Sequence, residues 1–344
     1  MFKFRPMIAA AALALSVVAA HAASVPNGTV YSADEGDGSI SAIALRAGTV
    51  RTVPIPIVPH NVQISPDGKT LLAVGGLKQG SQEHGSAEAK AQAQQHGDSA
   101  LLILDAGSLD LLETLPSGDH PAHVVTSPDG RLAYITNADA NHLSVVDIGK
   151  KKIISEIPTG KSPHGLRLSP DGKNLYVANT DGNTVSVIDT KSLKETARIA
   201  VGKAPVQVAF TPDGEHVYVS LADENSVAVI DTATGKVATQ IGVGRNPIQL
   251  YAAGSDKMYV ANQGSAADPD NTVSVIDTKS RKVVATVVTG KGAHGVAASG
   301  DGAFVFVTNS VDDTVSAIDA ATQEVTATWP IGPNPNGITF RSPR

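Results

Sequence analysis

Short runs of β-branched and apolar residues alternate with turn residues along the whole chain, and one apolar phrase returns at a nearly constant interval. Its clearest copies are 185–189, 227–231 and 273–277, and all three end in Val-Ile-Asp. The seven copies end at Ala44, Asp105, Asp147, Asp189, Asp231, Asp277 and Asp319. Four of the six intervals are 42 residues long, and the others are 61 and 46 residues. The chain is therefore built from seven repeats, two of which carry insertions.

Each repeat contains four strand-like segments separated by turn residues. In one repeat these segments are 165–169, 174–178, 184–188 and 195–199. The turns between them are rich in Pro, Asp, Gly and Asn, as in Pro170-Asp-Gly172. Four short strands in a repeat of about 40–45 residues are typical of a propeller blade. The sequence predicts an all-β, seven-bladed β-propeller of four-stranded antiparallel blades.

The two ends of this repeat pattern complement each other. Residues 30–33 align with the second strand of the repeat, whereas residues 336–340 align with the first. We therefore expect the C-terminal strand to complete the first blade, which would remove two open sheet edges. Residues 23–344 are then expected to form a single propeller domain.

The first 22 residues have a different character. A basic start is followed by the apolar run 8–20 and by Ala20-His-Ala22, which predicts a signal peptide cut before Ala23 and no membrane span. The expected location is the periplasm or the secreted fraction. The chain has no cysteine and a formal net charge of −6, and its charges are scattered, so a nucleic-acid partner is not favoured.

The repeat text of Leu175-Tyr-Val-Ala-Asn179, with Ser169-Pro-Asp-Gly172 and Val185-Ser-Val-Ile-Asp189, resembles the YVTN-repeat β-propeller family. That family includes archaeal surface-layer proteins and bacterial periplasmic propellers, and it is more distantly similar to the haem d1 domains of nitrite reductases and to propeller lactonases. The resemblance implies the scaffold and leaves the function open, since one scaffold hosts many functions. Positions at which the repeats differ are therefore the informative ones.

One such position lies six residues before the turn proline, where the first strand enters the channel. It holds His60, Ala122, His164, Val206, Ile248, His294 and Asn336 in successive repeats, and the third repeat carries His123 one residue later. We expect these residues to form a ring around one mouth of the channel, with the histidines as ligands for zinc or copper. The alternative is that each imidazole caps its local strand as part of the repeat pattern.

Two other features are candidates for the same site. The insertion 78–97 is rich in Gly, Gln and Ala and contains His84 and His96; we expect a mobile loop that captures metal, or else a surface insertion with incidental histidines. Arg167 is the only charge at its position of the first strand. With Asn336 it is a candidate for holding an anionic ligand or cofactor, although a salt bridge between blades would explain it equally well.

These observations favour a periplasmic carrier or chaperone that holds zinc or copper and passes it to an envelope protein or transporter. Release on acidification would follow from an ordinary histidine pKa near 6.5. A metal- or histidine-dependent hydrolase or lyase, similar to the lactonases, is an alternative. The absence of Glu and Asp from the aligned ring argues against it, because a lactonase-like propeller would be expected to place carboxylates around its cation. A propeller that binds a haem d1-like tetrapyrrole and an envelope protein-interaction module remain further alternatives. No catalytic triad, nucleotide loop or haem-attachment motif is present.

Overall fold

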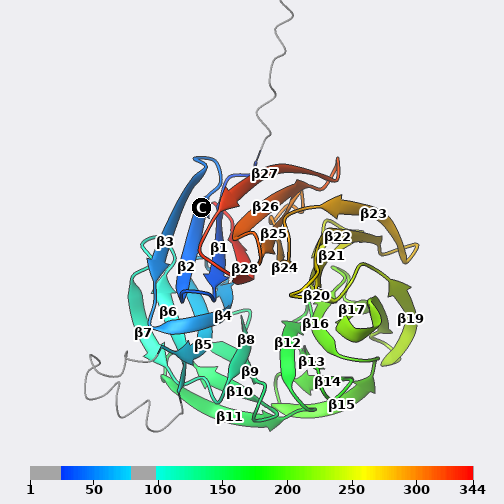
Figure 1. The fold of residues 1–344 in the computed structure, drawn as a ribbon. Helices are drawn as coiled ribbons and strands as arrows, with labels where there is room; N and C mark the ends of the chain where they lie inside the picture. Colours follow the sequence, from blue (N-terminus) through cyan, green and yellow to red (C-terminus); the bar gives the residue numbers. More distant parts are fainter. Residues whose placement is uncertain (1–24, 79–97, 344) are drawn as a thin grey trace, which may run out of the picture.

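The computed structural model describes residues 25–78 and 98–343, which form seven four-stranded antiparallel sheets around a central channel (Figure 1). The predicted seven-bladed propeller is confirmed. The predicted signal peptide and all but the first residue of the insertion 78–97 lie outside the described residues. Within the described part of the chain, we find no helix with the length and hydropathy that crossing a membrane requires.

Each blade begins with its innermost strand, except the first. The first three blades contain β28 (Pro335–Arg341), β1 (Thr29–Asp34), β2 (Ser39–Ala44) and β3 (Thr49–Pro54); β4 (Ile57–Ile64), β5 (Thr70–Leu77), β6 (Ser99–Asp105) and β7 (Leu111–Leu115); and β8 (Pro121–Thr126), β9 (Leu132–Asn137), β10 (His142–Asp147) and β11 (Lys152–Pro158). The next two contain β12 (Pro163–Leu168), β13 (Asn174–Asn179), β14 (Thr184–Asp189) and β15 (Lys194–Ala200); and β16 (Pro205–Phe210), β17 (His216–Leu221), β18 (Ser226–Asp231) and β19 (Lys236–Gly242), with a 3₁₀ turn at Ala222–Glu224. The last two contain β20 (Pro247–Ala253), β21 (Lys257–Gly264), β22 (Pro269–Asp277) and β23 (Lys282–Val288); and β24 (Ala293–Ala298), β25 (Phe304–Asn309), β26 (Thr314–Asp319) and β27 (Glu324–Pro330).

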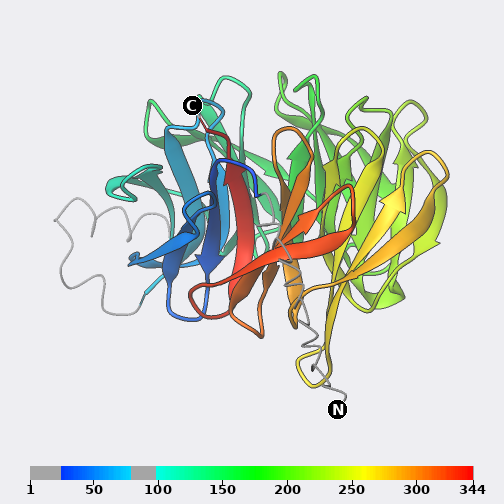
Figure 2. The same ribbon diagram turned by 90° about the horizontal axis from the view of Figure 1, so that it is seen from above.

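The first blade closes the ring with strands from both ends of the chain. Its strand order is β28-β1-β2-β3, and Tyr31 of β1 pairs with Thr339 of β28. Figure 2 shows β28, in red, running beside the blue strands of the first blade. The predicted closure is confirmed. Because β28 pairs with β1, the strands from the two ends of the chain do not leave two open sheet edges in the ring.

Apolar side chains of neighbouring blades pack against one another to form the core. Tyr218 and Tyr259, from the second strands of their blades, are fully buried, and the Tyr218 hydroxyl donates to the carbonyl of Thr278 in the next blade. The recurring aspartates have a local structural role, as at Asp189, whose carboxylate accepts from the backbone N–H of Ser192. These contacts stabilise the turns of the scaffold.

All seven innermost strands contain an irregular register close to their first residues. In β12, for example, Pro163 pairs with Asn179 and Leu166 pairs with Val177, so that strand has one extra residue. Such a β-bulge leaves backbone groups unpaired and turns the side chains at the bulge away from the regular alternation. The bulges fall at the positions that the sequence singled out, so they determine where the histidines point.

Candidate metal centre

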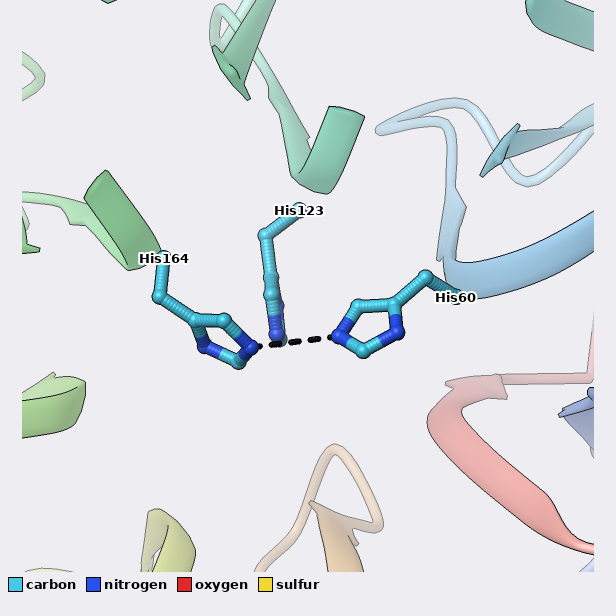
Figure 3. A group of neighbouring side chains, drawn as sticks. All are labelled: His60, His123 and His164. Carbon is cyan, nitrogen blue, oxygen red and sulfur yellow. Dashed lines mark hydrogen bonds between the residues drawn. The ribbon is translucent and has the colours of Figure 1, made fainter. Parts of the chain in front are cut away.

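Three histidines from neighbouring blades converge at the channel. His60 lies on β4, His123 on β8 and His164 on β12, and one ring nitrogen of each lies within 4.8 Å of the others. The ring centroids are 4.7–5.7 Å apart. Figure 3 shows the three side chains pointing toward one another from separate strands. We refer to these three residues as the histidine cluster.

The β-bulge explains why His123 joins the cluster although it is one residue out of line with the others. In β8 the bulge lies between Pro121 and Val124, so Ala122 and His123 together occupy the irregular position. Thr136 stabilises this arrangement: the His123 N–H donates to its hydroxyl oxygen, and the hydroxyl donates to the carbonyl of His164 in the next blade. The bulge backbone of one blade is thereby fastened to that of its neighbour.

His60 is oriented by a carboxylate. Its Nδ1 lies 3.1 Å from Oε1 of Glu35, whose other oxygen accepts from Nδ2 of Asn336. Burial raises the pKa of Glu35, but the hydrogen bond from His60 and the amide of Asn336 outweigh it, so the net pKa is lowered and the group is ionised at neutral pH. An ionised carboxylate can only accept, so His60 carries its proton on Nδ1 and has a lone pair on Nε2.

His164 is oriented in the same way by a backbone carbonyl. Its Nδ1 donates to the carbonyl oxygen of Val206 over 3.2 Å, which leaves its Nε2 with a lone pair. The two Nε2 atoms face each other at 3.1 Å, along the dashed line in Figure 3. Two nitrogen ligands at about 2.0–2.1 Å from a tetrahedral zinc ion would lie about 3.3 Å apart. The observed spacing therefore matches that of two ligands of one metal ion.

His123 completes the cluster from the interior. Its side chain is buried, and its Nε2 has no hydrogen-bond partner among the described residues. A buried nitrogen without a partner is costly unless it binds something, and a metal ion would satisfy it. Burial, followed by the neighbouring His164, holds the pKa of His123 well below its usual range. Burial also lowers the pKa of His164 to about 3. Both rings are neutral at neutral pH, the state that binds metal.

These pKa values correct one expectation from the sequence. Release of metal near pH 6.5 presumed ordinary histidines, whereas His123 and His164 resist protonation far below that pH because they are buried beside other imidazoles. Acidification in the range of pH 5–7 is therefore the wrong trigger for these two ligands.

The other predicted residues take different places. His294, on β24, lies outside the histidine cluster. Its side chain is buried, which lowers its pKa to about 4, and its Nδ1 has no hydrogen-bond partner in the described part of the chain. Asn336 contacts Glu35 and His60, as a support for the cluster. Arg167 faces a separate cavity, which the histidines do not line. His84 and His96 lie outside the described residues.

Two nearby residues were missed from the sequence. Glu35 follows β1, in the connection between the second and third strands, where other blades carry Ala138, Thr180 or Ser310. The aligned positions of the innermost strands hold no Glu or Asp, and the carboxylate beside His60 comes instead from the connection after β1. His120, just before β8, lines the same cavity and pairs with Asp139 at 3.0 Å.

The histidine cluster opens into a cavity of about 270 Å³. Its lining includes Glu35, His60, His120 and His164, together with the small residues Gly75 and Gly76 of β5. The side chain of His60 is 26% exposed, while His123 is 1% exposed. A metal ion bound by the cluster would therefore be held from the protein interior and reached from the cavity.

Comparisons with known proteins agree with this architecture. A model of the cytochrome D1 haem domain matches residues 93–200, and no curated protein sequence matches the chain significantly. Hydrazine synthase from Kuenenia stuttgartiensis is similar in structure, with 22% identity, a TM-score of 0.67, and coverage of 83% of this chain and 90% of that one. A functionally unknown protein from Desulfotomaculum acetoxidans DSM 771 aligns over 92% of this chain and 100% of its own, with 15% identity and a TM-score of 0.73. At these identities the structural likeness shows the fold alone.

The family itself is shown by the sequence. A model of YNCE-like β-propellers matches residues 166–342, just over half of the chain. The predicted resemblance to YVTN-type propellers, and its distant relation to haem d1 domains, is thus confirmed. The chain belongs to the YNCE-like β-propeller family.

Proposed function

We propose that this propeller binds one zinc or copper ion through His60, His123 and His164 and carries it in the periplasm. The observation that supports this most directly is the pair of Nε2 lone pairs facing each other at 3.1 Å. In each ring the Nδ1–H is engaged in a hydrogen bond, which leaves the lone pair on Nε2. The Nδ1 of His60 donates to the Glu35 carboxylate, and the Nδ1 of His164 donates to the Val206 carbonyl. Metal-binding histidines characteristically make this second hydrogen bond, which fixes the tautomer that exposes the ligand nitrogen.

The alternative explanation of this contact is a proton shared between the two rings. It requires one imidazole to be charged, and burial together with the neighbouring His60 lowers the pKa of His164 to about 3. A charge on His164 is therefore disfavoured at neutral pH, and neutral imidazoles match the ligand preference of zinc and copper.

A site with three protein ligands leaves a fourth metal position for an exchangeable ligand. The cavity beside His60 and His120 would give such a ligand access to an ion held by the cluster. An incoming donor from a partner protein could occupy it and draw the ion out, which suits a carrier that delivers metal to an envelope transporter. Periplasmic location is part of this proposal and rests on the signal peptide predicted for residues 1–22.

The test is a titration of metal-free protein with zinc and with copper, followed by calorimetry. We expect one ion per chain, and at least a tenfold loss of affinity in each of His60→Ala, His123→Ala and His164→Ala. His142→Ala and His216→Ala are matched controls, because these histidines lie on β10 and β17 away from the cluster and should not alter binding. Failure of the wild type to bind either metal, or unchanged binding by the triple alanine variant, would refute the proposal.

A second candidate is supported by the cytochrome D1 match. The matched segment, 93–200, contains both His123 and His164, either of which could be an axial ligand of a tetrapyrrole. Protein purified from its native host should then absorb in the visible region, with a band that His123→Ala or His164→Ala shifts. A colourless protein that takes up zinc or copper stoichiometrically would favour the carrier instead.

A further inference from the structure

The channel contains a second layer of side chains, three residues further along each innermost strand than the histidine position. The equivalent residues, which we call the arginine ring, are Gln63, Val125, Arg167, Ala209, Tyr251, Ala297 and Thr339. Three residues of a strand span about 10 Å. The arginine ring is therefore a separate layer from the histidine cluster, although both belong to the same strands.

A cavity of about 250 Å³ lies at this layer. It is lined by Arg167 and Tyr251, by the polar side chains of Gln63, Thr126 and Thr339, and by apolar residues such as Phe340. Among the described residues, no aspartate or glutamate lines it, so the guanidinium is the charge that this part of the chain presents to the cavity.

Arg167 has no acidic partner within salt-bridge distance in the described part of the chain, so the interblade salt bridge considered from the sequence is not formed there. Its Nε is buried without a hydrogen-bond partner, and one terminal nitrogen makes only a long contact, 3.4 Å, to the carbonyl of Leu166. The guanidinium lies 5.4 Å from the centre of the Tyr251 ring, which stabilises the cation but uses none of its donors. Arg167 is only partly buried, but a buried Nε–H without a partner is costly unless a ligand in the cavity accepts from it.

The neighbouring groups are also suited to an anion. The hydroxyl oxygen of Thr339 accepts from the backbone N–H of Ile64, so its own proton remains available for donation. The Gln63 amide donates to the Ile64 carbonyl with one of its two N–H groups, which leaves the other. Guanidinium, hydroxyl and amide donors thus line one side of this cavity of about 250 Å³.

We propose that the arginine ring binds a small oxyanion, a carboxylate or phosphate group, with Arg167 as its principal ligand. The planar fork of arginine donates two parallel hydrogen bonds to such a group. The apolar walls provided by Tyr251, Ala297 and Phe340 would cover the remainder of a small organic acid. This site does not depend on metal binding at the histidine cluster.

The experiment compares thermal unfolding of the full chain in buffer containing only chloride with unfolding after addition of succinate or inorganic phosphate. Ligand at about 100 times its dissociation constant should stabilise the wild type measurably. Arg167→Gln should abolish the stabilisation, and Arg167→Lys should weaken binding at least tenfold because it keeps the charge but loses the fork. Arg46→Gln is the control, since Arg46 is an exposed arginine in the turn between β2 and β3 and does not line this cavity. Without added oxyanion, Arg167→Gln should melt at or above the wild-type temperature, which shows that the variant folds.

Stabilisation by succinate alone would identify a carboxylate site, and stabilisation by phosphate alone would identify a phosphate site; both support the proposal. Equal effects on wild type and Arg167→Gln, or no effect of either anion at tens of millimolar, would overturn it. Zinc titration of Arg167→Gln separates this result from the proposed function, because the metal site should remain intact in that variant.

Discussion

Asp34 occupies a position at which four other blades carry asparagine, and its replacement by asparagine should stabilise the protein. It is fully buried at the end of β1 and accepts hydrogen bonds from the hydroxyls of Ser32 and Ser41. In three of these blades the asparagine amide contacts the serine seven residues later, as Asn179 does with Ser186 at 2.9 Å. Asparagine therefore fits this position geometrically, while an ionised aspartate carries an uncompensated charge there.

The magnitude follows from the pKa of Asp34, which burial raises from 3.8 to about 6. A difference of about two units corresponds to about 3 kcal/mol of stability lost when the carboxyl must be ionised in the folded state. The sign follows from proton binding: between these two pKa values the folded state holds more protons than the unfolded state, so stability falls as pH rises. Asp34→Asn should give little gain near pH 4 and its full gain above about pH 6.5.

Differential scanning calorimetry at pH 4.5 and pH 7.5 measures this difference. With an unfolding entropy of about 2.1 cal/mol/K per residue over roughly 300 residues, a gain of about 3 kcal/mol corresponds to a rise of about 5 °C in the melting temperature. Asp223→Asn, at an exposed position, controls for the change in net charge. A variant that is no more stable than the wild type at pH 7.5, or that gains equally at both pH values, would refute this reasoning.

Two further changes test the environment of the histidine cluster. Glu35→Gln should weaken zinc affinity by about 10–100-fold in calorimetric titration, because it removes the carboxylate that orients His60. Asp37→Asn, in the same turn, is the control and should leave zinc affinity unchanged. Equal zinc affinities of the two variants would mean that Glu35 does not support the site. Gly165→Ala should lower stability in urea unfolding by about 1–3 kcal/mol, because the new methyl carbon would lie 2.5 Å from the Val206 carbonyl oxygen. Gly242→Ala, which meets nothing within 4 Å, is its control, and equal effects of the two would contradict the packing argument.

The sequence was sufficient for the strands and the blade count because both depend on local alternation and on turn residues. The segment expected at 184–188 corresponds to β14 at Thr184–Asp189. The strand expected to begin at Gly165 begins earlier, at Pro163, because it includes the bulge. A bulge adds one residue without changing the hydrophobic pattern, so the alternation alone gave no sign of it.

The candidate site was predicted in part for a related reason. His60 and His164 share one repeat position, and the comparison of repeats at that position was enough to find them. Glu35 required the same comparison at a different position, after the second strand, because that connection reaches the same mouth of the channel. The bulge in β8 brings His123 into the group, whereas His294 lies in the last blade, with the first blade between it and His60, and is outside the group of three.

The two layers of the channel offer opposite chemistry, and this follows from where the repeats depart from one another. The histidine cluster presents nitrogen lone pairs, with the ionised Glu35 behind them, and so favours a cation. The arginine ring presents N–H and O–H donors around one guanidinium and so favours an anion. Other blades fill the same positions with Val206, Ile248 or Ala209, so the repeat does not require polar residues there. Buried polar groups at such positions are costly without partners, and the two ligands proposed above would supply those partners in both layers.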